Sequence, residues 1–248
     1  MNIDKIEMLS LTETFKSELL SRGAVLVGFG DLTELPPKMR SGLPIGICVA
    51  VKYPREVIRG ITDLPTQEYF DWYNKLNDKL DELVSIGAKL LHIEGYQAIA
   101  QTRMHVGTGD ILSTALPHKT VATRAGIGWI GKNALLVTEK YGSMLRISSI
   151  LTDAPMKTAS PINTSRCANC MICTNACPAH AVSGKLWSVD MYRDEFFNPI
   201  SCRKTAKERA NQGFGGEATI CGKCIEVCPY TQKYLMNNNI NVQNDSDE

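Results

Sequence analysis

The 248-residue sequence lacks the features that would point to a membrane or nucleic-acid-binding protein. Its 27 Lys and Arg residues nearly balance its 26 Asp and Glu residues, so the net charge of +1 gives no electrostatic attraction to either partner. It has no run of 18 apolar residues, which a membrane-spanning helix needs. No basic segment followed by an apolar core opens the chain, so no secretory signal is expected. We expect a cytoplasmic protein without membrane contact.

Cysteine is abundant, by contrast, and its spacing is ordered. Nine cysteines are present, and all but Cys48 lie in the last third of the chain. They read Cys167-x2-Cys170-x2-Cys173-x3-Cys177-Pro178, then Cys202, then Cys221-x2-Cys224-x3-Cys228-Pro229. Eight thiolates are the number that two [4Fe–4S] clusters need. Structural zinc prefers two separate cysteine pairs, and disulfide frameworks belong to short secreted chains.

The spacing also predicts which cysteine binds which cluster. In the bacterial ferredoxin pattern, the fourth cysteine of a run serves the other cluster. The second run lacks one cysteine, and Cys202 is the replacement. Cluster I would then take Cys167, Cys170, Cys173 and Cys228, and cluster II would take Cys221, Cys224, Cys202 and Cys177. These ligands predict one-electron transfer in a reducing compartment.

Apolar periodicity predicts an α/β (α+β) domain before the cysteines. Helices are expected at residues 5–23, 66–94 and 118–124, and strands at 24–30, 44–52 and 95–100. The second strand is apolar on both faces, which predicts a central position and a buried Cys48. Residues 134–138 and 144–151 alternate like a hairpin. We predict a first domain at residues 1–157, a ferredoxin-like domain at 158–236, and a disordered Asn-rich, acidic tail at 237–248.

A glycine-rich segment at residues 125–133 matches two nucleotide-binding patterns imperfectly. The G-x-G-x-x-G fingerprint needs a strand before it and a helix after it, and here the order is reversed. The G-x4-G-K match ends in Asn133, where a magnesium-binding Ser or Thr is required. We expect a turn that brings the backbone close to another cofactor; a purely structural turn is the alternative. The candidate cofactor-binding residues are Gly126, Gly128, Trp129, Gly131, Lys132 and Asn133.

Residues 124–133, together with Leu135-Leu136, Gly142-Ser143, residues 151–153 and both cysteine motifs, resemble epoxyqueuosine reductase, a relative of the reductive dehalogenases. The resemblance covers residues 105–232. It implies a nitroreductase-like domain that holds cobalamin beside a ferredoxin-like domain. It also implies that the clusters pass single electrons from an external low-potential donor to cobalt, which reduces a small-molecule or nucleoside substrate.

The chain departs from this family in two places. The family's proton-donating acid falls on Leu112, so Asp110 is a candidate substitute, and the family's following Glu falls on His118. We take Asp110 and His118 as the candidate catalytic residues, with His105 and Tyr141 as further acid–base candidates. The family also continues into a helical-repeat region that helps to hold tRNA. Because this chain stops soon after Cys228, we expect a short form for which tRNA is not a partner.

Two other functions fit the same residues. The chain could be an electron carrier or reductive activator with no substrate chemistry, which would fit the missing acid. It could instead hold flavin, because nitroreductase-like folds commonly do. His180, three residues after Cys177, could tune a cluster by hydrogen bonding.

Overall fold

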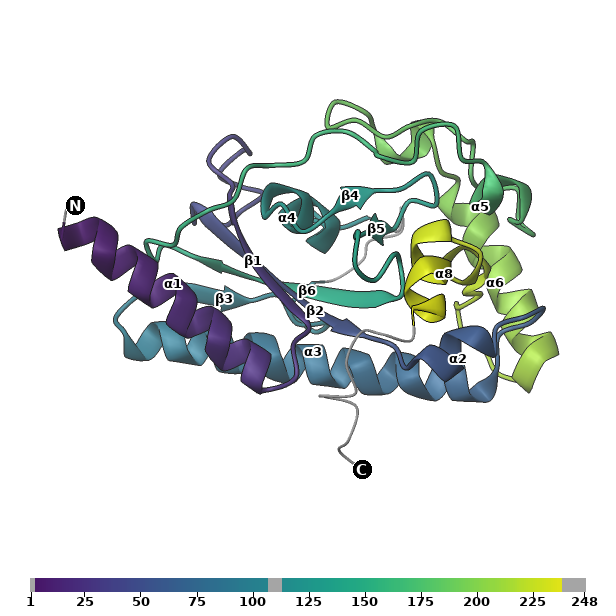
Figure 1. The fold of residues 1–248 in the computed structure, drawn as a ribbon, viewed down its shortest axis with the longest axis horizontal. Helices are drawn as coiled ribbons and strands as arrows, with labels where there is room; N and C mark the ends of the chain where they lie inside the picture. The colour runs from purple at the N-terminus through teal and green to yellow at the C-terminus, as the bar shows by residue number, and fades with distance from the viewer. Residues whose placement is uncertain (1–2, 107–112, 238–248) are drawn as a thin grey trace.

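A four-stranded antiparallel sheet forms the centre of the molecule (Figure 1). The computed structural model describes residues 3–106 and 113–237. The strands run in the spatial order β1 (Leu26–Asp31), β2 (Ile45–Lys52), β6 (Leu145–Thr152) and β3 (Ala98–Ala100). The mixed α/β fold class predicted from the sequence is confirmed.

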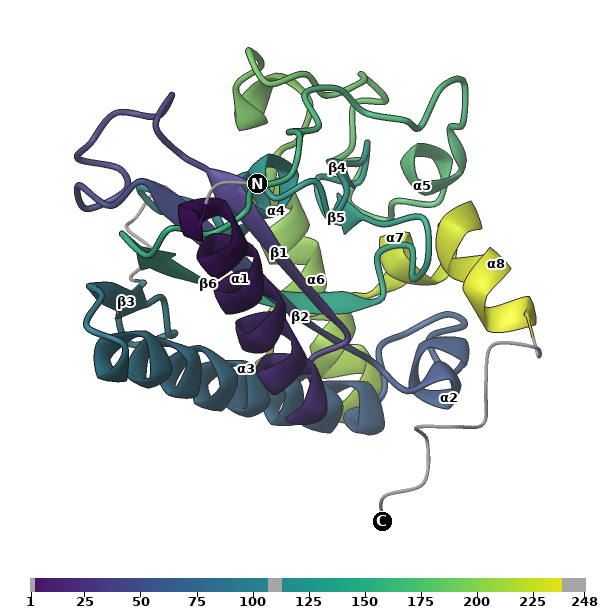
Figure 2. The same cartoon turned by 60° about the vertical axis from the view of Figure 1, so that its left-hand side comes forward.

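Helices cover both faces of this sheet. Helix α1 (Ile3–Ser21) and the long α3 (Gln67–Ile93) pack on one face, and α4 (His118–Arg124) packs on the other (Figures 1 and 2). Helix α3 begins at Thr66, whose side chain accepts a hydrogen bond from the backbone N–H of Tyr69. Its leucines recur at helical spacing and bury one stripe against the sheet.

Strand β2 is central, as predicted, and its side chains alternate between two hydrophobic cores. Ile47, Val49 and Val51 belong to the core under α1 and α3, whereas Cys48 belongs to the core under α4. Cys48 is fully buried, which raises the pKa of its thiol to about 12. Glycine lets α4 approach closely, because a Cβ on Gly30 would lie 2.6 Å from the backbone of Arg124.

The predicted hairpin of residues 134–138 with 144–151 is wrong. Strand β5 (Leu136–Val137) pairs instead with β4 (Trp129–Ile130), while β6 joins the central sheet between β2 and β3. Residues 138–142 connect the two sheets and form only an isolated bridge, Thr138 to Gly142. Local alternation identified the strands correctly, but their partners lie elsewhere in the chain.

The cysteine-rich segment covers one end of the sheet, beyond α2 (Arg55–Arg59) (Figure 1). Its short elements are α5 (Ile172–Asn175), η1 (Arg193–Glu195), α6 (Pro199–Phe214), α7 (Lys223–Glu226) and α8 (Pro229–Met236). Helix α6 was not predicted, although its signals are in the sequence. Asn198 caps it by accepting from the Ser201 N–H at 3.0 Å, and Gly215 ends it with a φ of 74°.

One hydrophobic core joins the two predicted domains. Ala210, Ile220, Ile225 and Leu235 from the cysteine-rich segment belong to the same buried cluster as the residues under α3. Phe214 of α6 stacks on Phe70 of α3 with a centroid distance of 5.4 Å. The domain boundary at residue 157 stays a prediction. Within residues 3–106 and 113–237, no helix is both long and apolar enough to cross a bilayer.

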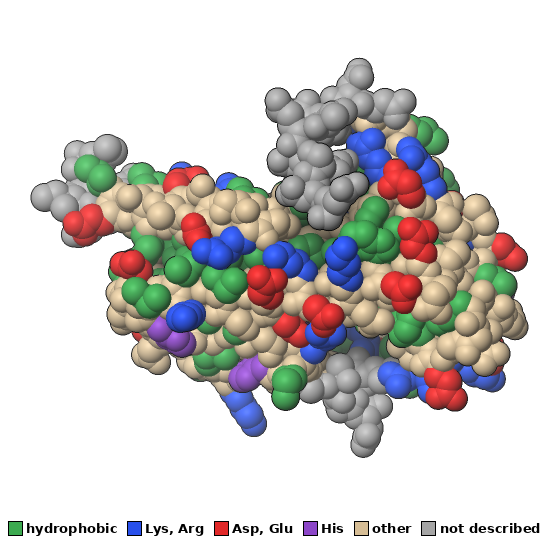
Figure 3. All heavy atoms as spheres, turned by 90° about the horizontal axis from the view of Figure 1, so that it is seen from below, with side chains coloured by type: hydrophobic (Ala, Val, Ile, Leu, Met, Phe, Trp, Pro, Cys, Tyr) green, Lys and Arg blue, Asp and Glu red, His purple; other side chains and the backbone are tan. Residues whose placement is uncertain are grey.

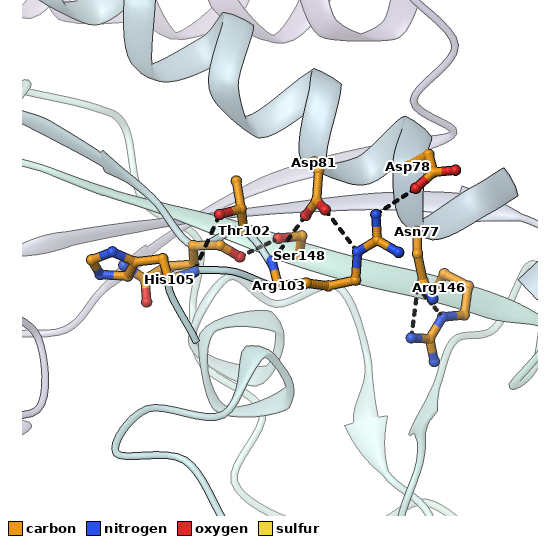
Figure 4. A network of polar contacts seen from close by, with 9 residues as sticks. Asn77, Asp78, Asp81, Thr102, Arg103, His105, Arg146 and Ser148 are labelled. Atoms are coloured by element: carbon orange, nitrogen blue, oxygen red, sulfur yellow. Dashed lines mark hydrogen bonds and ion pairs between the residues drawn. The ribbon is translucent and has the colours of Figure 1, made fainter. Parts of the chain in front are cut away.

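Polar contacts attach the segment after β3 to α3 (Figure 4). Arg103 forms ion pairs with Asp78 and Asp81, and its backbone N–H also donates to Asp81. Arg146 of β6 donates twice to the amide oxygen of Asn77.

Basic and acidic side chains are interspersed on the face of the molecule seen in Figure 3, so no patch of a single charge sign dominates that face.

Candidate functional site

The cysteine thiols lie in two groups. Burial, followed by the neighbouring thiolates of Cys228, Cys167 and Cys170, raises the pKa of the Cys173 thiol to about 11. These four cysteines are the set predicted for cluster I. Cys167 and Cys170 of the first run and Cys228 of the second therefore lie within electrostatic range of Cys173.

The remaining thiols form the second group. Burial raises the pKa of Cys202 to about 11, with contributions from Cys177 and Cys221. Cys224 is perturbed in the same direction, first by burial and then by Cys202 and Cys221, and more weakly by Cys173 and Cys177. This is the set predicted for cluster II, and Cys224 is the thiol that senses both groups, because Cys173 of the first group also acts on it.

The spread of these thiols suits a cluster better than a single ion. In the described part of the chain, no three His, Cys, Asp or Glu side chains converge tightly enough to hold one metal ion. A four-iron cube holds its thiolates further apart than a tetrahedral zinc ion does. All nine cysteines are free, so no disulfide competes for them. The donor set therefore fits two [4Fe–4S] clusters.

Local geometry repeats between the two runs. The spacing of Cys170, Cys173 and Cys177 is that of Cys221, Cys224 and Cys228, and in both runs the middle cysteine lies in a short helix, α5 or α7. Ala218, which is buried, occupies the position that corresponds to Cys167. Cys202, in the first turn of α6, would supply the thiol that is missing at Ala218. The remainder of α6 therefore lies between Cys202 and the second run.

The glycine motif forms a tight hairpin rather than a nucleotide loop. A Cβ on Gly128 would lie 2.2 Å from the carbonyl oxygen of Val137 on the paired strand, so this position requires glycine. Gly126 adopts a φ of 64° beside the carbonyl of Ser160, and a Cβ on Gly131 would meet the Asn133 side chain. Ala134 ends the turn with a φ of 59°. We refer to residues 131–134 as the β4–β5 turn.

Lys132 and Asn133 in this turn contact the loops that carry the cluster cysteines. Lys132 is 4% exposed, and its Nζ donates to the Cys170 carbonyl at 3.0 Å. The Asn133 amide donates to the Cys224 carbonyl at 3.4 Å and to Ser143 Oγ at 3.0 Å. Two adjacent residues therefore hold one loop from each group of thiols. Their role in binding a further cofactor stays a prediction.

Trp129 also contacts the cysteine-rich segment. It is 1% exposed and packs against Cys228 and Cys167, with the Tyr230 ring edge-on at a centroid distance of 5.0 Å. The Arg166 guanidinium lies 5.6 Å from the centre of the indole ring. Its indole N–H has no hydrogen-bond partner in the part of the chain described. The side chain is thus part of the wall around the first group of thiols.

A half-open cavity of about 310 Å³ lies beside the second group of thiols. It is bounded by α4, β6, the start of α3, and α7, whose Ile225 directly follows Cys224. Aliphatic side chains line part of it: Leu135, Leu136, Leu145, Ile147 and Ile225. Polar side chains line the rest: Tyr53, Tyr69, Thr114, His118, Lys119, Ser143 and Arg146. A larger cavity, of about 360 Å³, lies at the other end of β6 around Tyr96 and is remote from the cysteines.

His118, a predicted catalytic residue, lines the cavity near the second group of thiols. Its Nδ1 forms a hydrogen bond of 2.9 Å with Ser149 Oγ, which leaves Nε2 for the cavity. Burial and, to a smaller extent, the charge of Arg146 lower the His118 pKa to about 4, while Asp81 acts in the opposite direction. The imidazole is therefore neutral at physiological pH.

Lys119, which sequence reasoning missed, lies next to His118. Its Nζ donates to the carbonyl oxygen of Ala134 at 2.7 Å. Burial lowers the Lys119 pKa to about 8, and the charge of Arg193 contributes in the same direction. Although part of the side chain is solvent-accessible, the amine lies deep enough for desolvation to dominate. The family pattern drew attention to position 118 and not to its neighbour.

Two tyrosines connect the cavity to the second group of thiols. The hydroxyl groups of Tyr53 and Tyr69 are hydrogen-bonded to each other, and their ring centroids lie 5.3 Å apart. Burial raises the pKa of Tyr53 to about 12, and that of Tyr69 is also raised, first by burial and then by Tyr53, with a further contribution from Cys224. From the sequence, Tyr69 was predicted only as part of the helix at residues 66–94.

Of the other predicted acid–base residues, those that the structure describes do not line this cavity. Asp110 is outside the described residues. His105 follows β3, where its backbone N–H donates to Thr102 Oγ1 at 3.4 Å (Figure 4). Tyr141 is buried against Tyr234 of α8, at a ring-centroid distance of 5.0 Å. His180 is exposed, with a φ of 46°.

Comparison with known proteins supports the iron–sulfur assignment. Residues 166–231 match the family described as "4Fe-4S double cluster binding domain". An epoxyqueuosine reductase from Synechocystis sp. is 28% identical over 206 residues, which are 82% of this chain and 67% of that protein. One from Synechococcus sp. (strain CC9605) is 34% identical over 128 residues, 51% of this chain and 39% of that protein. The predicted resemblance to epoxyqueuosine reductase is confirmed.

Solved structures share the fold. An epoxyqueuosine reductase with a tRNA-Tyr stem loop has a TM-score of 0.58 at 20% identity, covering 90% of this chain and 66% of that one. The catabolic reductive dehalogenase NpRdhA with 3-bromo-4-hydroxybenzoic acid has a TM-score of 0.67 at 17% identity, covering 88% and 31%. The chain therefore spans only part of the proteins that it matches. Together the comparisons support an iron–sulfur reductase similar to epoxyqueuosine reductase.

One expectation needs correction. The absence of a basic bias and of a helical-repeat region led us to exclude tRNA as a partner. Epoxyqueuosine reductase, to which this chain is similar, is nevertheless seen with a tRNA stem loop. The exclusion is therefore wrong. A near-neutral net charge is a property of the whole chain and does not report on a local binding surface.

Proposed function

We propose that this protein is an iron–sulfur reductase in which two [4Fe–4S] clusters deliver single electrons to a cobalamin-type cofactor that reduces a small-molecule or nucleoside substrate. The observation that carries the proposal is the position of the cavity directly beside the second group of thiols, through Ile225 next to Cys224. A redox site and a small-molecule site are thus adjacent, as electron transfer to a bound group requires.

The proposed ligands are the two groups of thiols described above. Cluster I takes Cys167, Cys170, Cys173 and Cys228, and cluster II takes Cys177, Cys202, Cys221 and Cys224. The pKa perturbations within each group support this division, because each perturbed thiol senses members of its own set. Cys224 also senses Cys173 of the other set, so an electron would pass between the clusters near these two thiols.

The cavity lining suits a flat ring with polar substituents. Five aliphatic side chains provide apolar surface, and tyrosine, serine and threonine hydroxyls provide hydrogen bonds. A volume of about 310 Å³ is at the lower end for small-molecule sites, so a corrinoid would also extend beyond the open side. A corrinoid supplies a cobalt centre that exchanges single electrons with the clusters. A reductive dehalogenase with a TM-score of 0.66 is described with B12-dependent dehalogenation.

The protein's own residues would supply the proton that a reduction needs. His118 is neutral and presents Nε2 to the cavity, while Lys119 carries a proton on an amine whose pKa is lowered to about 8. A group with a pKa near the working pH transfers protons efficiently. We therefore propose Lys119 as the proton donor, with neutral His118 as a hydrogen-bonding partner of the bound group; Asp110, the other residue chosen from the sequence, stays a candidate donor.

Two alternatives remain open to test. A flavin would fit the same apolar and polar lining, and an electron carrier would use the clusters without turnover. The tRNA stem loop seen with an epoxyqueuosine reductase makes a modified tRNA nucleoside one substrate to assay. We also propose that an external low-potential donor supplies the electrons and that the protein is cytoplasmic.

The deciding experiment is anaerobic purification of the full chain with iron and cobalt quantified per chain. Absorbance spectra are recorded before and after addition of cobalamin. We expect about eight irons and one corrinoid per chain. About eight irons with no corrinoid uptake would refute the cobalamin proposal, and a flavin spectrum would then separate a flavoprotein from an electron carrier. Markedly fewer irons would refute the ligand assignment.

A further inference from the structure

Two cationic side chains line the polar side of the cavity in the described part of the chain, and Asp81 acts on His118 from outside that lining. Lys119 and Arg146 both line it, and His118 adds a hydrogen-bond donor or acceptor at Nε2. Among the described residues that line the cavity, none is Asp or Glu. A desolvated cation is costly unless an anion or several acceptors compensate it.

Each of these side chains keeps donor capacity that the protein does not use. Lys119 Nζ makes one hydrogen bond, to the Ala134 carbonyl at 2.7 Å, although an ammonium group has three donors. Arg146 uses Nε and Nη2 on Asn77 Oδ1, at 3.0 and 2.7 Å, and its guanidinium lies 4.4 Å from the centre of the Tyr73 ring. In the residues described, Nη1 of Arg146 has no hydrogen-bond partner.

These contacts fix the cations in place. Asn77 is 4% exposed and holds Arg146 from the buried face of α3 (Figure 4). Lys119 is held by the β4–β5 turn, which also contacts both cysteine loops. The cations therefore need no rearrangement to receive a ligand, which is the preorganisation that specific anion binding requires.

We propose that Lys119, Arg146 and His118 form an oxyanion subsite that binds the carboxylate or phosphate group of a small organic acid, whose apolar body packs on the aliphatic side of the cavity. This rests on the proposed function and narrows it, because it names the substrate class. The small volume of the cavity suits a small organic acid. The anion would lie beside cluster II through Ile225 and Cys224.

Benzoate and its neutral isostere benzamide test the subsite. Binding to the full chain with both clusters in place is measured anaerobically by isothermal titration calorimetry. We expect benzoate to bind at least about tenfold more tightly than benzamide, as one charge-assisted hydrogen bond implies. Lys119→Met should remove about that preference, with benzamide binding unchanged. Lys79→Met, which breaks an exposed pair with Glu82, is the matched control and should change neither affinity.

Further variants and ligands keep the test decisive. Arg146→Lys retains the charge if Arg146→Met fails to fold, and it should retain part of the benzoate preference. Equal affinity for benzoate and benzamide, or an unaltered preference in Lys119→Met, would overturn the subsite. So would tight binding of a tRNA stem loop that competes with benzoate while benzoate alone shows no preference over benzamide.

Cobalamin distinguishes the possible sources of the anion. Simultaneous binding of benzoate and cobalamin would support a substrate subsite. Mutual exclusion would overturn it, because the cations would then bind the cofactor's phosphate. Iron content and cobalamin uptake are recorded on the same samples. Loss of benzoate binding with about eight irons and bound cobalamin would therefore refute the subsite alone, not the reductase.

Discussion

The two groups of cluster cysteines are built alike but are held by different chemistry. Lys132, a buried cation, contacts the loop of Cys170 in the first group. The neighbouring Asn133, a neutral amide, contacts the loop of Cys224 in the second. The second group also has the cavity and Tyr69 close by, whereas Trp129 and Tyr230 pack against the first. One turn thus gives two similar sites different electrostatic surroundings, which is a way to separate their reduction potentials.

The strongest way to break this comparison is to disturb the β4–β5 hairpin, whose turn contacts both groups of cysteines. Gly128→Ala would place a Cβ 2.2 Å from the Val137 carbonyl, so we expect the hairpin to deform and iron to be lost from both clusters. Iron per chain and the melting temperature report this. Gly60→Ala is the matched control, because its Cβ would come no closer than 3.4 Å to any atom. Full iron content in Gly128→Ala would show that the cysteine loops do not depend on the turn.

Removing one ligand should separate the sites. Cys170→Ala is expected to lower iron from about eight to about four per chain, because cluster binding and local folding are coupled. Cys48→Ala, which removes the one thiol outside both groups, should leave iron content unchanged even if its buried position costs stability. Iron analysis with electron paramagnetic resonance distinguishes the surviving cluster. Eight irons in Cys170→Ala would contradict the ligand division.

A charge substitution sharpens the comparison without removing a ligand. Lys132→Met should lower the reduction potential of cluster I by several tens of millivolts, since about 59 mV corresponds to a tenfold change for one electron. The reason is the loss of a buried positive charge beside Cys170. Asn133→Ala should shift the potential of cluster II less, because it removes only a neutral donor. Redox titration monitored by paramagnetic resonance measures both.

The electrostatic reasoning implies that Lys132→Arg keeps the potential near its original value. A shift as large in Lys132→Arg as in Lys132→Met would point to altered packing rather than lost charge. Equal shifts of both clusters in Lys132→Met would contradict the assignment of this residue to one site.

The smallest expected effect concerns the pH dependence of stability on the cavity side. The folded His118 pKa of about 4 lies below its usual value of 6.5, so the unfolded chain takes up a proton first as the pH falls. Stability from this residue is present above pH 6.5 and is lost between pH 6.5 and 4, by about 1–3 kcal/mol. Denaturant unfolding of His118→Gln should show a shallower loss over that interval. An unchanged slope would place His118 in a solvated position.

Sequence reasoning succeeded where the signal is local and failed where it depends on partners in space. The cysteine spacing predicted two [4Fe–4S] clusters because short loops present thiols at fixed intervals, and the match to a double-cluster family supports this. The division into two sets of four ligands stays a prediction. The central strand was found because β2 is apolar on both faces. The hairpin was misplaced because alternation identifies a strand but not its neighbour, and β6 pairs with β2 and β3 instead.

The candidate site was predicted in part. The family pattern named His118 as a candidate catalytic residue, and the structure places it in the cavity lining. Lys119 and Arg146 were not chosen, since each occupies an ordinary position for a helical or strand residue. Lys132 and Asn133 were chosen as cofactor-binding residues, and the contacts found for them are with cysteine loops. Lys132 and Cys170 are 38 positions apart in the sequence, and Asn133 and Cys224 are 91 positions apart. Only folding brings each pair within hydrogen-bonding distance.

The shared core limits how freely the parts of this protein can be exchanged. A ferredoxin-like segment is often treated as a portable module, but here Ile220, Ile225 and Leu235 are buried in the core under α3, and the β4–β5 turn belongs to the other half of the sequence. A recombined protein would have to inherit that turn along with the cysteines. Because the core is shared, substitutions in the cysteine-rich segment have to remain compatible with the packing of α3, and the two parts of the sequence are expected to evolve together.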